Sequence, residues 1–128
     1  MSAENVEGWL ESGVNRLSIG VQSLRPDALR FLERLHSGPD AIAAIRTARA
    51  GGFANVNADL LYGVPGENLS GWLETLDAVL AEGVQHLSAY ELTVESQTRL
   101  GQEVRTGLVQ MPGADDQLEQ YWAAVATL

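Results

Sequence analysis

The strongest constraint on the fold is the stretch Val56–Gly66, whose sequence is VNADLLYGVPG. It begins as a short, nearly continuous apolar run and ends at Gly63-Val64-Pro65-Gly66, where two glycines and a proline disfavour further strand or helix. The pattern predicts a buried strand that runs out into a loop. Because such apolar runs are typical of strands covered by helices on both faces, we expect a parallel sheet with helices on both sides.

Asp59 is the one charged residue within this apolar strand. A carboxylate buried without a partner would be costly, so we expect Asp59 to bond to a group in the sheet or to a bound ligand. The strand alone leaves both interpretations open. A purely structural bond to neighbouring backbone or to an arginine would explain the residue as well as a ligand contact would.

Composition limits what the chain can be. Its 128 residues, 45% of them hydrophobic, predict a single globular domain over residues 1–128 with a real core. The absence of cysteine excludes disulfides, thiol nucleophiles and thiolate-bound metal within the chain. A net charge of −9 argues against a surface for nucleic acid. No apolar run approaches the roughly 20 residues of a membrane span and no signal peptide is present, so we expect a cytoplasmic setting.

Periodicity and turn residues predict alternating strands and helices. A short helix over Asn5–Ser12 precedes the first strand, Asp40 is expected to start a helix, and Asn68 or Ser70 to cap another. Strand starts roughly 30 to 40 residues apart are typical of right-handed βαβ crossovers, which predicts an α/β fold with three parallel strands. The expected strands lie near residues 15–22, 55–62 and 86–93, and the expected helices near residues 26–35, 40–50, 70–82 and 114–127. The segment 98–105 is a further short-helix candidate, and a weak internal echo relates Gly13–Ser18 to Gly83–Ser88.

Polar residues gather where the predicted strands end. In parallel α/β folds, ligands bind beyond the carboxyl ends of the strands. Each such residue could instead anchor a loop, but their coincidence at one rim favours a site. The candidates are Gln22 and Ser23 after the first strand, Asp59, Tyr62, Gly63 and Pro65 around the end of the second, and Tyr90, Glu91 and Thr93 at the end of the third.

Other mechanisms find little support in the sequence. His36 and His86 are the only histidines, and neither has a metal-binding partner three or four residues away, so we expect both in loops or at the surface and predict no metal site. There is no nucleophile elbow, no dinucleotide fingerprint and no phosphate-binding loop. We therefore assign no catalytic residue within the chain.

Four stretches of the chain share a characteristic order and spacing: GVNRLSIGVQS (residues 13–23), Arg34-Leu35-His36, GFANVNADLLYGVP (residues 52–65) and HLSAYELTVE (residues 86–95). As a set, these stretches resemble the radical S-adenosylmethionine enzymes of the oxygen-independent coproporphyrinogen III oxidase family. The resemblance implies an open, six-stranded relative of the (β/α)₈ barrel, of which this chain would supply about the second half. It also implies that Gln22, Arg34 and Asp59 contact S-adenosylmethionine, with Tyr62, Gly63, Pro65, Tyr90 and Thr93 as a possible pocket rim.

The stretch SAYELTVE (residues 88–95) is similar to the heme-chaperone branch of that family, which suggests heme or porphyrin binding and heme delivery rather than porphyrinogen oxidation. The family's three-cysteine motif for a [4Fe–4S] cluster and its first glycine-rich motif are missing, so the cluster cannot be bound through thiolates of this chain. We therefore expect a piece of a longer oxidoreductase-like protein that is inactive alone.

The missing N-terminal half of the barrel is the expected partner, and open strand edges predict self-association of the chain alone. A stand-alone half-barrel that binds or scaffolds without catalysis is the main alternative. An aldolase-like or sugar-phosphate enzyme is disfavoured, because the chain has no lysine for a Schiff base and no phosphate-cradling loop.

Overall fold

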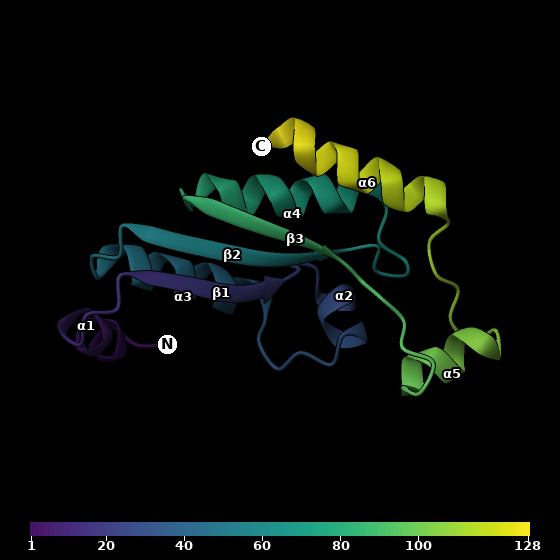
Figure 1. Ribbon diagram of the computed structural model, residues 1–128, viewed down its shortest axis with the longest axis horizontal. Helices are drawn as coiled ribbons and strands as arrows, with labels where there is room; N and C mark the ends of the chain where they lie inside the picture. Colours follow the sequence, from purple (N-terminus) through teal and green to yellow (C-terminus); the bar gives the residue numbers. More distant parts are fainter.

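The computed structural model describes residues 1–128 and contains one sheet of three parallel strands in the order β1-β2-β3. The order and direction of the strands confirm the predicted parallel α/β arrangement. Helices follow strands along the chain, as the colours of Figure 1 show. The strands are β1 (Arg16–Gln22), β2 (Asn55–Tyr62) and β3 (His86–Glu91). The helices are α1 (Ala3–Glu11), α2 (Pro26–Phe31), α3 (Gly38–Ala50), α4 (Leu69–Ala81), α5 (Arg99–Arg105) and α6 (Ala114–Thr127).

The long helices pack against one face of the sheet and leave the other face open (Figure 1). Val56, Ala58 and Leu60 of β2 belong to the covered face and are completely shielded from solvent. The intervening residues Asn57 and Asp59 belong to the open face. The expectation of helices on both sides is therefore wrong, because Asn57 and Asp59 interrupt the apolar run of β2 on the face that no helix covers.

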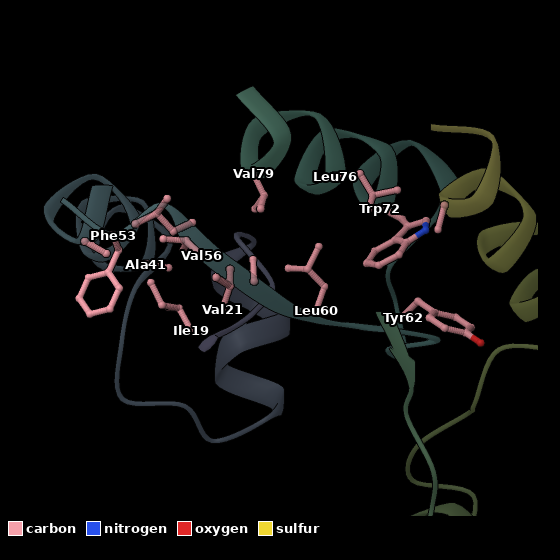
Figure 2. Close-up of a cluster of buried hydrophobic side chains, with 14 of the residues drawn as sticks. Ile19, Val21, Ala41, Phe53, Val56, Leu60, Tyr62, Trp72, Leu76 and Val79 are labelled. Atoms are coloured by element: carbon pink, nitrogen blue, oxygen red, sulfur yellow. The ribbon is translucent and has the colours of Figure 1, made fainter. Parts of the chain in front are cut away.

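The core lies between the covered face of the sheet and the helices. Figure 2 shows Leu60 of β2 directed toward Leu76 and Val79 of α4, whereas Val56 lies near Ala41 of α3 and Phe53. Burying a side chain of this size contributes about 1.5–3 kcal/mol of transfer free energy, so this layer is the main source of stability. Near the end of the layer, the rings of Tyr62 and Trp72 lie with their centroids 5.8 Å apart.

Helix α6 is bonded to α4 and to the loop after β2 through one residue, Gln120. The indole Nε1 of Trp72 donates to the backbone oxygen of Gln120 at 2.9 Å. The Gln120 amide accepts from the backbone N–H of Gly63 at 2.8 Å and donates to the backbone oxygen of Glu67 at 3.3 Å. Because Gln120 is only 2% exposed, these bonds fix the course of the loop in a setting that water does not reach.

Several element ends differ from the sequence prediction. Helix α3 begins at Gly38 rather than at Asp40, because the Ser37 hydroxyl caps it and the Asp40 side chain returns to the Ser37 N–H. Helix α2 ends at Phe31 rather than near residue 35, and β3 ends at Glu91 rather than at residue 93. Asn68 is the residue that caps α4. None of the helices combines the length and the apolar character needed to cross a membrane.

The docking of α6 can be tested with Trp72→Phe. This substitution keeps an aromatic ring but removes the Nε1–H donor, which leaves the buried Gln120 oxygen without that partner. We expect the free energy of unfolding in urea to fall by about 1–3 kcal/mol. Trp122→Phe is the matched control, since Trp122 is 58% exposed, and it should change stability by less than about 0.5 kcal/mol. Equal effects of the two substitutions would contradict this account of α6.

Candidate functional site

A chain of polar side chains crosses all three strands on the open face. In the parallel register Ser18 of β1 lies beside Asn57 of β2, and Asp59 of β2 lies beside Ser88 of β3. Asn57 donates to Ser18 Oγ at 2.8 Å and accepts from Ser88 Oγ at 3.1 Å. These contacts form a hydrogen-bonded group, the cross-strand network, made of Ser18, Asn57, Asp59 and Ser88.

Both carboxylate oxygens of Asp59 take part in this network. Oδ1 accepts from Asn57 Nδ2 at 2.8 Å and Oδ2 accepts from Ser18 Oγ at 3.0 Å. The partner expected from the sequence thus consists of two side chains, neither backbone nor arginine. A carboxylate offers about four lone-pair positions, so Asp59, which is half-buried on the open face, keeps acceptor capacity for a ligand.

Gln22 ends β1 in an unusual backbone conformation. The pairing with β2 shifts between Gly20 and Gln22, which marks a bulge. The φ angle of Gln22 is +67°, and the Ser23 N–H donates to the Val21 oxygen at 2.8 Å, so Gln22 is the central residue of a tight three-residue turn. A residue other than glycine rarely adopts this conformation, and strained backbone of this kind clusters at functional sites.

The Gln22 side chain lies over Gly20. A Cβ atom at position 20 would lie 3.1 Å from Gln22 Nε2, closer than an ordinary contact, so glycine leaves room for the amide. Gly20 pairs directly with Asp59 in the register. The bulge therefore brings the Gln22 amide to the same face as the Asp59 carboxylate.

Arg34 lies in the turn after α2 and is exposed, and its guanidinium forms no hydrogen bond or ion pair. The turn is nevertheless anchored, because His36 Nε2 contacts the Val21 oxygen at 2.9 Å and the Arg34 N–H donates to the Leu29 oxygen at 2.9 Å. The same Val21 oxygen accepts from Ser23 beside Gln22. Arg34 is thus held near the end of β1 with its side chain free for an anionic group.

The other predicted rim residues do not all reach the open face. Leu61 lies two residues after Asp59 and pairs in register with Tyr90 of β3. The Tyr90 side chain therefore lies on the open face, and it is 56% exposed. Tyr62 belongs to the covered face, between Trp72 and Tyr121.

The remaining candidates lie in loops. Gly63, with φ of +75°, and the half-buried Pro65 shape the loop that Gln120 holds. Thr93 lines a cleft between α2 and α5. Ser23 is buried and Glu91 is exposed.

Glu67 is a buried carboxyl group close to this rim. It is 6% exposed, its Oε2 accepts from Ser23 Oγ at 3.4 Å, and its Oε1 has no partner. Removal from water raises the pKa of Glu67 from its usual 4.5 to about 7, although nearby Arg25 and the Ser23 hydroxyl act in the opposite direction. Glu67, a residue of the loop after β2, therefore changes charge near neutral pH.

Sequence analysis missed Asn57, His36 and Glu67 as members of this region. Ser18 and Ser88 carried a signal in the echo between Gly13–Ser18 and Gly83–Ser88, which places a serine at the same position of both outer strands. Nothing comparable marks Glu67, because its burial depends on the loop being folded back under α6.

The donor set fits an organic ligand better than a metal ion. No group of three histidine, aspartate or glutamate side chains is arranged to hold a metal ion. An amide, a carboxylate and an unpaired guanidinium can together recognise hydroxyl, ammonium and carboxylate groups of one small molecule. The absence of cysteine leaves no thiolate ligand for an iron–sulfur cluster in this chain.

The pKa of Glu67 predicts how stability depends on pH. The folded chain holds a proton on Glu67 up to about pH 7, whereas the unfolded chain releases it near 4.5. The contribution of Glu67 to the free energy of unfolding should therefore be most favourable at low pH and be lost as the pH rises from about 4.5 to about 7. Glu67→Gln, which is neutral at every pH, should be more stable than the wild type above pH 7 by on the order of 2–3 kcal/mol.

Glu74→Gln is the matched control, because it removes the same charge from an exposed position of the following helix. Urea unfolding at a series of pH values gives the comparison. A stability difference between Glu67→Gln and the wild type that stays constant from pH 4 to pH 8 would contradict the raised pKa.

Comparison with known proteins gives this face a context. Residues 1–79 match the Radical SAM superfamily. The chain is 43% identical over 110 residues to the heme chaperone HemW of Mycobacterium tuberculosis, covering 86% of this chain and 28% of that protein. It is 34% identical over 121 residues to HemW of Bacillus subtilis, covering 94% of this chain and 32% of that protein.

The fold has a close structural counterpart. Coproporphyrinogen III oxidase (HemN) from Escherichia coli superposes with a TM-score of 0.82 at 23% identity, over 98% of this chain and 29% of that structure. The chain thus spans less than a third of the length of each of these proteins. Since the superfamily match covers more than half of its residues, the chain belongs to the Radical SAM superfamily, and its sequence is similar to proteins named as heme chaperones.

Proposed function

We propose that the open face, with Gln22, Arg34 and Asp59, is one side of a binding site for S-adenosylmethionine. The observation that carries the proposal is the placement of the Gln22 amide over Gly20, next to the Asp59 carboxylate in the register. A strained turn that serves to direct one polar side chain toward a carboxylate on an uncovered face is typical of a ligand site.

Each of the three side chains has a chemical counterpart in S-adenosylmethionine. The Asp59 carboxylate can accept hydrogen bonds from ribose hydroxyls or from the methionine ammonium group, and the Gln22 amide can both donate and accept. The unpaired Arg34 guanidinium suits the methionine carboxylate, which it can bind through two parallel N–H donors. When bound in a complete site, S-adenosylmethionine supplies radical chemistry, and the part of these three residues is to hold and orient it.

We further propose that the whole protein acts as a heme chaperone of the HemW type and that this chain alone is inactive. The support is the similarity to two proteins named as heme chaperones, together with the stretch SAYELTVE. The lack of cysteine means that thiolate ligands for a reducing cluster would have to come from sequence outside this chain. Heme or porphyrin would be the partner of the whole protein.

The site proposal is tested by isothermal titration of S-adenosylmethionine into the wild type and into Asp59→Ala. Because the open face provides only one wall of a pocket, we expect weak binding to the wild type. Loss of a hydrogen-bonded charged group should weaken it by at least about tenfold in Asp59→Ala. Gln22→Ala should weaken it to a smaller degree, since an uncharged bond is lost.

Asp77→Ala is the matched control, because Asp77 is exposed on α4 and makes no side-chain hydrogen bond or ion pair. It should bind as the wild type does. Tight binding that is indifferent to both Asp59 and Gln22 would refute the assignment of the site.

β1 and β3 each pair on one side only, so two rows of backbone donors and acceptors are unpaired within the sheet. We expect the isolated chain to self-associate through these edges. Size-exclusion chromatography with light scattering over a range of concentrations measures this, and a well-folded, strictly monomeric species at every concentration would contradict it.

A further inference from the structure

We propose that Asn57 is a positioning residue that orients the Asp59 carboxylate for its ligand. The inference rests on the proposed function of Asp59, and it adds a role for a residue that does not itself have to touch the ligand. Asn57 is only 3% exposed, whereas Asp59 is half-buried at the open face.

The hydrogen bonds of the cross-strand network all run in one direction, toward Asp59. Ser88 Oγ donates to Asn57 Oδ1, and Asn57 Nδ2 donates to both Ser18 Oγ and Asp59 Oδ1. Ser18 Oγ then donates to Asp59 Oδ2 at 3.0 Å. Aligned donors strengthen one another in a weakly solvated setting, and the negative charge at the end of the chain favours this direction over the reverse.

The chemistry of residue 57 has to be that of an amide. Its nitrogen supplies two hydrogens, and both are used, while its oxygen serves as the acceptor for Ser88. With the amide turned over, its oxygen would face the Asp59 carboxylate at 2.8 Å, which is repulsive, so the orientation is fixed by its neighbours. An aspartate at position 57 would bring a second carboxylate against Asp59.

The consequence for Asp59 is a fixed orientation before any ligand arrives. Each of its oxygens is held by one inward donor, on Asn57 or on Ser18. Its remaining lone pairs are therefore directed by the sheet rather than by the ligand, which reduces the ordering that binding requires.

The first experiment needs no ligand. In the isotope-labelled 128-residue chain, three-bond couplings report the χ1 angle of Asp59 and the carboxyl carbon shift reports its hydrogen bonds. In the wild type we expect a single χ1 rotamer for Asp59. In Asn57→Ala we expect the χ1 angle of Asp59 to average over several rotamers and its carboxyl carbon shift to change. Ser88→Ala should cause a smaller change of the same kind. Asn55→Ala is the control, because Asn55 is an exposed asparagine of the same strand without side-chain hydrogen bonds.

The second experiment is a double-mutant cycle with S-adenosylmethionine as the probe, followed by chemical-shift titration so that millimolar affinities can be measured. In the background that retains Asp59, Asn57→Ala should weaken binding roughly three- to tenfold. It should have no further effect in the Asp59→Ala background, because Asn57 acts through Asp59. A general loss of structure would instead weaken binding in both backgrounds.

The outcomes separate the two proposals. If Asp59→Ala leaves binding unchanged or the wild type does not bind, the proposed site fails, while the Asp59 couplings still decide whether Asn57 orients the carboxylate. An Asp59 that keeps its rotamer and carboxyl shift in Asn57→Ala overturns the positioning role. So does an equal loss of affinity in both backgrounds. If Asn57→Ala does not fold, Ser88→Ala decides by the same criteria.

Discussion

The structure depends on β2 being the central strand, hydrogen-bonded in parallel to β1 on one side and to β3 on the other. In a parallel register, paired residues of neighbouring strands lie on the same face of the sheet. The alternation of apolar and polar residues in β2 therefore makes one face of the sheet apolar and the other polar. Val56, Ala58 and Leu60 direct one face toward the helices. Asn57 and Asp59 make the opposite face polar and draw Ser18 and Ser88 into a common network. Stability and the candidate site therefore come from alternate residues of one strand.

The polar face of the sheet is constrained by the cost of burying polar groups that lack hydrogen-bond partners. Buried polar groups must find partners, and Asn57 finds three of them on three different residues. Glu67, in the loop after β2, is one of the exceptions, because one of its carboxyl oxygens has no partner. A neutral carboxyl is the less costly form in that position, which is why its pKa rises to about 7. The hydrogen bonds of Gln120 thus stabilise the loop, whereas the unpartnered oxygen of Glu67 destabilises it.

Much of this could be predicted from residues close together in sequence. The turn Gly63-Val64-Pro65-Gly66 and the spacing of strands predict the parallel βαβαβα order, and strand ends predict Gln22 and Asp59 as neighbours. What could not be predicted depends on contacts between distant residues. The placement of all the long helices on one face of the sheet depends on such contacts. The start of α3 depends on the Ser37 cap, and the burial of Glu67 depends on the docking of Gln120. Tyr62 belongs to the covered face, although it ends the same strand as Asp59.

The left-handed backbone at Gln22 has a consequence for any attempt to make this chain more robust. Glycine adopts a φ angle of +67° without steric cost, so thermostability alone would favour glycine at this position. A laboratory selection for heat resistance would thus enrich a substitution that deletes the amide over Gly20. Glutamine at position 22 therefore carries a backbone cost that glycine would avoid.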